Sequence, residues 1–128
     1  MSNSKANLYE LHSQNKEWIN ALAFYKDEVN FLENRLKEIA GKYTDHDLLA
    51  QCDSFFNRLT IQKSEIHRLK EAIKGKEVLL GEEIIHNPVA VDHREFAPED
   101  REREAVENFE SIYHDLRKDL ISFFAKWM

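Results

Sequence analysis

Carboxylate and imidazole side chains recur between residues 83 and 100, a combination suited to binding a divalent metal ion. Glu83 and His86 are three residues apart, a spacing that places both side chains on one face of a helix. His12 and His93 are further nitrogen ligands of the kind that transition metals prefer. One of two function hypotheses is therefore a metal-binding helical protein with a site formed by His12, Glu83, His86 and His93. Acidic neighbours that could contribute to it are Asp92, Glu95, Glu99 and Asp100.

The pattern falls short of a known catalytic motif. Four-helix di-iron proteins use two E-x-x-H motifs and two further glutamates, whereas this chain has one such motif, and Glu110 and His114 are spaced by four. The sequence contains no H-E-x-x-H or G-x-S-x-G pattern, and its three glycines are isolated, which excludes a phosphate-binding glycine loop. We predict no enzymatic activity, and no cofactor apart from the metal ion of this alternative.

Cys52 is the single cysteine of the chain. It occupies a position in a helical row of apolar residues, where a small apolar side chain packs well and a thiolate is poorly solvated. We therefore expect Cys52 to serve packing rather than redox chemistry.

The other function hypothesis comes from phenylalanines that lie outside the expected core positions. Phe24 and Phe31 are seven residues apart and share a stripe that points away from the main apolar row of their helix, and Leu49 and Phe56 form a similar pair. A wide core within one chain would bury some of these residues. The excess nevertheless favours an interaction or scaffolding module that self-associates or binds a partner helix through Phe24, Phe31, Leu49 and Phe56, with a two-fold homodimer as the simplest assembly.

Three long rows of apolar residues, spaced alternately three and four apart, predict the elements that carry these side chains. We call each row an apolar seam. The expected helices span about residues 5–40, 45–86 and 98–127, with connections at 41–44 and 87–97. Gly41 is expected to end the first helix, and Thr44 or Asp45 to cap the second. Gly75 and Gly81 leave open whether residues 76–86 continue the second helix.

The seams predict an all-α fold, an antiparallel up-down-up bundle of three helices in one domain. Only Asn15, Gln62 and Lys76 interrupt them with polar residues. Their many aromatic side chains are too wide for a two-stranded coiled coil and favour a core of three or more helices, completed by oligomerisation. In this topology the starts of the first and third helices meet the end of the second, which would bring the candidate metal ligands together.

Composition excludes several function classes. Among 128 residues, 18 Lys and Arg stand against 24 Asp and Glu, a net charge of -6 that argues against a nucleic-acid partner. Only 3 glycines and 2 prolines leave few places for the turns of a β-rich fold. No apolar run of about 18 residues is present, and the start of the chain lacks the apolar core of a secretory signal. The sequence therefore predicts a cytoplasmic protein without a membrane partner.

Overall fold

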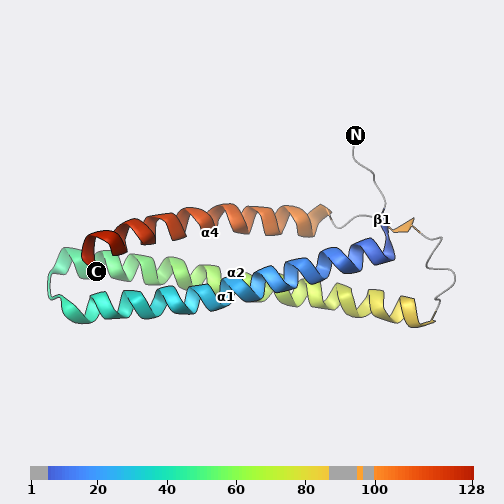
Figure 1. Cartoon of the computed structure of the whole chain (residues 1–128), viewed down its shortest axis with the longest axis horizontal. Coiled ribbons are helices and arrows are strands. Elements are labelled where there is room, and N and C mark those ends of the chain that lie inside the picture. Colours follow the sequence, from blue (N-terminus) through green and yellow to red (C-terminus); the bar gives the residue numbers. More distant parts are fainter. Residues whose placement is uncertain (1–5, 87–94, 97–99) are drawn as a thin grey trace.

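The computed structural model contains three long helices, α1 (Leu8–Lys42), α2 (His46–His86) and α4 (Asp100–Trp127). It describes residues 6–86, 95–96 and 100–128. Figure 1 shows α1 and α2 as an antiparallel pair, with α4 running along one side of that pair in the same direction as α1. The all-helical, up-and-down arrangement predicted from the seams is thus present in the single chain.

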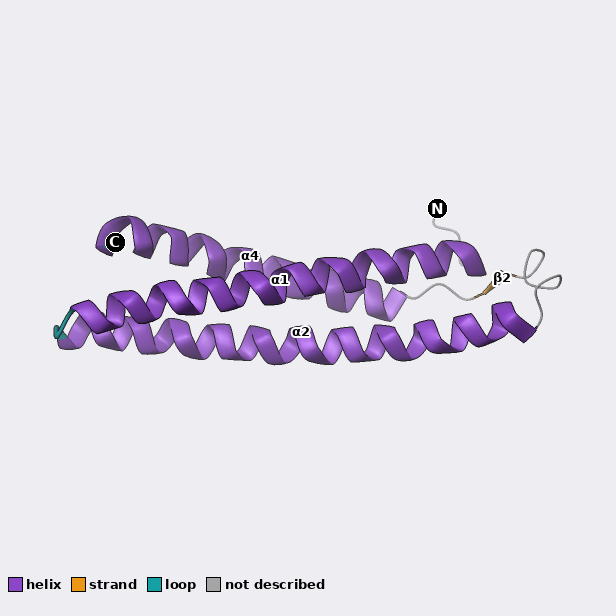
Figure 2. Ribbon diagram, turned by 60° about the horizontal axis from the view of Figure 1, so that its bottom comes forward, coloured by secondary structure: helices purple, strands orange, loops and turns teal. Residues whose placement is uncertain are grey.

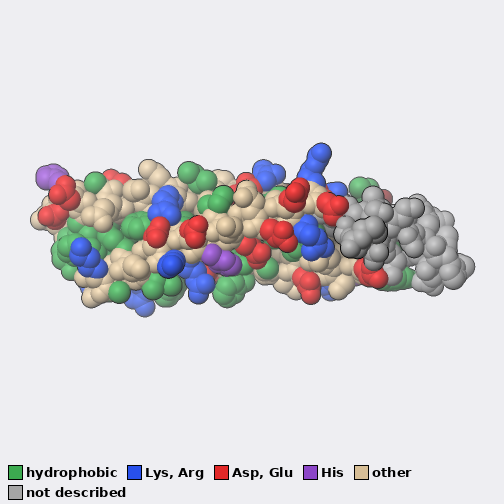
Figure 3. Space-filling model, turned by 90° about the horizontal axis from the view of Figure 1, so that it is seen from above, with side chains coloured by type: hydrophobic (Ala, Val, Ile, Leu, Met, Phe, Trp, Pro, Cys, Tyr) green, Lys and Arg blue, Asp and Glu red, His purple; other side chains and the backbone are tan. Residues whose placement is uncertain are grey.

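The helices differ in length, and this shapes the bundle. α4 has 28 residues and α2 has 41, so α4 covers only part of the α1–α2 pair (Figure 2). Seen from the side of α4, hydrophobic side chains gather toward the end that carries the C-terminus, whereas charged side chains of both signs crowd the middle (Figure 3). The start of α4 is therefore the more polar part of this face.

The seams form the core as predicted. Most seam residues expose less than a tenth of their surface, because spacing by three and four keeps one stripe of each helix toward its neighbours. Two of the three polar interruptions, Asn15 and Gln62, are also buried. The largest fully buried side chains include Leu22 and Leu36 of α1, Leu59 and Ile73 of α2, and Phe109 and Tyr113 of α4.

The turn between α1 and α2 confirms one predicted cap and corrects one predicted stop. Asp45 is the cap, since its Oδ1 accepts a hydrogen bond from the Leu48 backbone N–H at 2.9 Å. Gly41, however, lies inside α1, which continues to Lys42, and its backbone does not adopt a positive φ. A residue in the left-handed conformation is not needed to end this helix, because Tyr43 holds the turn against α4. The Tyr43 hydroxyl donates a hydrogen bond to the Trp127 carbonyl oxygen at 3.1 Å.

Residues 76–86 continue α2 without interruption to His86. Contacts on both sides hold this segment in place. Lys76 forms an ion pair with Glu102 of α4 at 3.3 Å, and Glu77 bonds to Asn15 of α1 at 3.1 Å. These contacts offset the weak helix propensity of Gly75 and Gly81.

The first helix begins at Leu8 rather than near residue 5. Ala6–Asn7 forms a two-residue strand, β1, which pairs antiparallel with β2 (Glu95–Phe96) in the register Ala6 to Phe96 and Asn7 to Glu95. Two residues are too few to show the alternation that identifies a strand in a sequence, so this pairing could not be predicted.

Candidate functional site

The end of the bundle predicted to bind a metal ion does bring the start of α1 beside the end of α2. His12 contacts the carboxylate of Glu77 through Nδ1, rather than Glu83 or His86. The His86 side chain is exposed at the last position of α2, and His93 lies outside the described residues. Among the residues that the structure describes, no three His, Cys, Asp or Glu side chains are placed to share a metal ion. The predicted four-ligand site is therefore not assembled by the described part of the chain.

Glu77 is the residue that the sequence interpretation missed at this end. Its Oε1 accepts a hydrogen bond from Asn15 Nδ2 at 3.1 Å, and its Oε2 faces His12. Asn15 is fully buried, and its Oδ1 has no hydrogen-bond partner among the residues that the structure describes. The cluster joins α1 to α2 and fixes their register, in the way that a single asparagine at a core position does in coiled coils.

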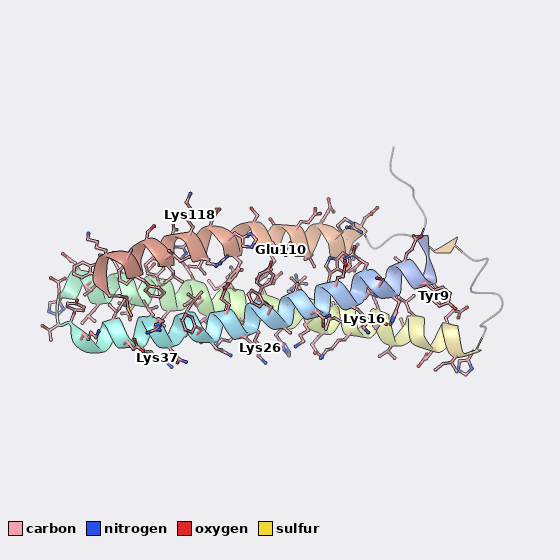
Figure 4. All side chains as sticks on the ribbon, in the orientation of Figure 1. Tyr9, Lys16, Lys26, Lys37, Glu110 and Lys118 are labelled. Carbon is pink, nitrogen blue, oxygen red and sulfur yellow. The ribbon has the colours of Figure 1, made fainter. Side chains whose placement is uncertain are left out.

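The second polar cluster lies between α1 and α4 and consists of two reciprocal tyrosine–glutamate pairs. Tyr25 of α1 donates to Glu110 of α4, and Tyr113 of α4 donates to Glu28 of α1, each at 2.6 Å. Figure 4 shows Glu110 between the two helices. The sequence carries a signal for this pairing, because Tyr25-x-x-Glu28 and Glu110-x-x-Tyr113 have the same spacing with the order of residue types reversed.

This cluster serves to hold α1 and α4 together rather than to transfer protons. Burial raises the pKa of Tyr25 to about 12, assisted by the hydrogen bond to Glu110. Burial likewise raises the pKa of Tyr113, and its bond to Glu28 acts in the same direction. Both phenols therefore remain protonated donors at physiological pH, and Glu110 is engaged by Tyr25.

Cys52 is 1% exposed, as its seam position predicts. Burial raises the pKa of its thiol, and the nearby Asp53 carboxylate adds to the effect. Because the thiolate is the reactive form, Cys52 has the environment of a packing residue.

Phe24 and Phe31 are exposed on α1, at 60% and 55% of their surface. Their stripe also contains Glu28, which accepts from Tyr113, so the stripe runs along the side of α1 next to α4. The Arg35 guanidinium lies over the Phe31 ring, 5.2 Å from its centre. Both phenylalanines thus extend into solvent, as predicted.

Leu49 and Phe56 lie elsewhere. With Lys63 they follow one edge of α2 at seven-residue intervals, and Lys63 bonds to Glu33 of α1 at 2.7 Å. Phe24 and Glu33 are nine residues apart, about two and a half turns, and therefore lie on opposite sides of α1. The four predicted interaction residues do not form one continuous surface. Phe56 is half-buried and packs against the core, as expected for a wide core within one chain.

The solvent-facing side of α1 around the two phenylalanines is poor in charge. We call it the α1 outer face; all its members are exposed except the half-buried Ala23. Only one of its seven side chains is charged, although a third of the chain is Asp, Glu, Lys or Arg. It consists of Asn20, Ala23, Phe24, Asp27, Asn30, Phe31 and Asn34.

No helix in the described ranges, 6–86 and 100–128, contains a stretch long and apolar enough to cross a membrane. No protein-family model, curated protein or solved structure matches the chain, so its function must be argued from these surfaces alone.

Proposed function

We propose that this protein is a helical interaction module that forms a two-fold dimer through the α1 outer face. The observation that carries the proposal is the exposure of Phe24 and Phe31, each more than half accessible, on one stripe. Two large apolar rings on one surface lose an unfavourable contact with water when a second apolar surface covers them.

The composition of the face supports a protein partner. Interface centres are depleted in charged residues and enriched in aromatic ones relative to the rest of a protein surface. The α1 outer face has both properties, with Asp27 as the single charge among its seven residues and the Arg35 guanidinium over the Phe31 ring at its edge. Charged residues return at its two ends, as Lys16 and Glu17 on one side and Lys37 and Glu38 on the other. An apolar centre with a polar rim is the usual anatomy of an interface.

The arrangement of these charges favours a second copy in parallel orientation. Seven-residue spacing puts Lys16, Ala23, Asn30 and Lys37 in one row along the face, and Glu17, Phe24, Phe31 and Glu38 in another. When two parallel helices meet through this face under two-fold symmetry, the first row of one copy lies against the second row of the other. Each lysine then meets a glutamate, and Phe24 packs against the small Ala23 of the second copy.

An antiparallel pair would place each row against itself. Lys16 would then approach Lys37 of the second copy, and Glu17 would approach Glu38. Each exposed ion pair contributes only about 0–1 kcal/mol, so the charges select the orientation while the phenylalanines supply the attraction. One helix from each copy makes a small interface, for which we expect a dissociation constant of about micromolar order.

Sedimentation velocity over a concentration series tests the proposal. The wild-type chain is expected to sediment increasingly as a dimer, and the Phe24→Glu, Phe31→Glu double variant as a monomer. Ile61→Glu is the matched control, since Ile61 is equally exposed, at 62%, but lies on α2. Circular dichroism verifies that all three proteins keep their helices. A wild-type monomer at high micromolar concentration, or a dimer that survives the double substitution but not the control, contradicts the proposal.

The metal-binding alternative and the cytoplasmic location stay predictions. No arrangement of the described residues favours the metal site over the interaction surface, since His12 is engaged with Glu77.

A further inference from the structure

A groove on the opposite side of the bundle from α4 has a different chemistry. It has a volume of about 570 Å³ and lies between α1 and α2, with no α4 residue in its lining. Lys26 lines it from α1, on the side that faces away from α4 (Figure 4). The α2 wall carries Lys63, His67, Lys70 and Lys74. This volume lies in the range of small-molecule sites in proteins.

The groove concentrates positive charge in a chain that is negative overall. Residues 63–76 contain five Lys or Arg and two Asp or Glu, against a net charge of -6 for the whole chain. Lys63 is paired with Glu33 at 2.7 Å. Within the described chain, Lys26, Lys70 and Lys74 have no carboxylate within ion-pair distance. Among the described residues, these three ammonium groups therefore have no ion-paired carboxylate, although Glu71 also lines the groove.

The positions of these side chains limit the shape of an anion that could fit the groove. Lys63, His67, Lys70 and Lys74 follow one edge of α2 at intervals of four, three and four residues, so they span about 16 Å at 1.5 Å per residue. Lys26 approaches from the other helix, and the buried Ile66 and the Ser64 hydroxyl complete this part of the wall. A row of this length suits an extended anion with several charges better than a single phosphate group.

We infer that the α1–α2 groove binds a small linear polyanion of the polyphosphate class, held by Lys26, Lys70 and Lys74. Lysine interacts with phosphate oxygens as a point charge, without demanding a fixed geometry, which suits a flexible chain of phosphates. The groove lining contains no Phe, Tyr or Trp side chain on which a nucleobase could stack, and His67 is its one ring. Inorganic polyphosphate and the triphosphate of a nucleotide share the relevant chemistry, and the phosphates should account for all of the affinity.

Isothermal titration calorimetry of the full chain at low salt, with three inorganic probes, tests the inference. Affinity should rise from orthophosphate through pyrophosphate to tripolyphosphate and fall as salt is added, because the attraction is between charges. Adenosine triphosphate should bind no more tightly than tripolyphosphate. Tighter binding of adenosine triphosphate would overturn the assignment to a phosphate-only site, and no binding of tripolyphosphate at millimolar concentration would overturn the inference itself.

Charge variants locate the binding. Lys70→Gln and Lys74→Gln should each weaken tripolyphosphate binding by about 2- to 5-fold, the range expected for one exposed charge pair. Glu71→Gln should strengthen it, since Glu71 is the carboxylate in the groove lining. Lys118→Gln, on α4 and pointing away from the groove (Figure 4), is the control and should change nothing. Equal weakening by Lys118→Gln and by the groove variants would mean diffuse attraction to surface lysines and would contradict a site.

The two surfaces can be tested separately. Lys26 lies on the α2 side of α1, whereas Phe24, two residues earlier, points about 160° away around the helix. The groove variants are therefore expected to leave the sedimentation of the protein unchanged, and the phenylalanine variants to leave anion binding unchanged.

Discussion

Tyr113 of α4 donates its hydroxyl hydrogen to Glu28 of α1 at 2.6 Å, and Tyr25 and Glu110 repeat the same bond in the reverse direction. Both pairs join residues 85 apart in the sequence. Because α1 and α4 run in the same direction, this constant offset sets one register between them. The rest of the buried contact between α1 and α4 is apolar, and apolar contacts allow two helices to shift along each other more easily than hydrogen bonds do. The two hydrogen-bonded pairs therefore fix the relative position of the helices.

Removing the hydroxyl of Tyr113 should destabilise the protein. Tyr113→Phe deletes a donor to a carboxylate inside the bundle and leaves Glu28 with the Arg117 guanidinium at 3.4 Å. We expect the free energy of unfolding to fall by about 1.5–3 kcal/mol, measured by denaturant titration. Ile112→Ala, half-exposed on the same helix, is the control and should cost less. A loss below about 0.5 kcal/mol for Tyr113→Phe would mean that the pair does not fix the register.

Stability should also decline at alkaline pH through Tyr25. Its pKa is raised from 10.0 to about 12 in the folded protein, so the neutral phenol is favoured by folding. This contribution is fully present below pH 10, where the phenol is neutral in both states, and is lost as the pH rises through 12. Unfolding titrations between neutral pH and pH 12 should show the decline, and Tyr25→Phe should make it shallower. An unchanged slope in the variant would contradict the assignment.

The glycines within the helices are positions where the protein can be stabilised. Gly75 and Gly81 have helical backbones without positive φ, and a Cβ built at either meets no atom within 4 Å. Gly75→Ala and Gly81→Ala should each raise the free energy of unfolding by up to about 1 kcal/mol, because alanine loses less backbone entropy. Thermal denaturation followed by circular dichroism measures the gain. A lowered melting temperature would indicate that α2 is not a regular helix at these positions.

Asn15 should contribute more to the register between α1 and α2 than to the free energy of unfolding. Its Oδ1 is buried and meets no donor in the described part of the chain, while its Nδ2 bonds to Glu77. Asn15→Leu removes the unsatisfied oxygen and adds apolar contact, for which we expect a gain of about 1 kcal/mol after the loss of the bond to Glu77. Denaturant unfolding at neutral pH provides the measurement. Destabilisation by Asn15→Leu would show that Oδ1 has a partner, such as an ordered water, in solution.

The sequence predicted the helices well because the seams report directly on burial. Leu22, Leu59 and Leu116 are fully or almost fully buried, as three- and four-residue spacing requires. The side chains that link one helix to another were harder to predict. Glu77 instead of Glu83 meets His12 because the register between two helices depends on packing along their whole length, which a motif within one helix does not contain.

The same reason separates the two predicted phenylalanine pairs. Seven-residue spacing places Phe24 with Phe31, and Leu49 with Phe56, but it does not say on which side of the α1–α2 pair the third helix lies. Once Glu28 and Glu33 mark the two edges of α1 through their bonds to α4 and α2, only Phe24 and Phe31 remain on the solvent face. The dimer proposal therefore depends on this pair alone.

Disulfide trapping at Asn34 tests the parallel dimer most directly. Asn34 lies in the middle row of the α1 outer face, so in a parallel dimer the two copies of an Asn34→Cys variant meet at the same height near the two-fold axis. Cys52 is buried and should not react. We predict rapid formation of a covalent dimer under mild oxidation, far faster than for Ser111→Cys on the exposed side of α4. If Asn34→Cys cross-links no faster than Ser111→Cys, or only when mixed with Asn20→Cys as an antiparallel pair requires, the proposed parallel dimer is wrong.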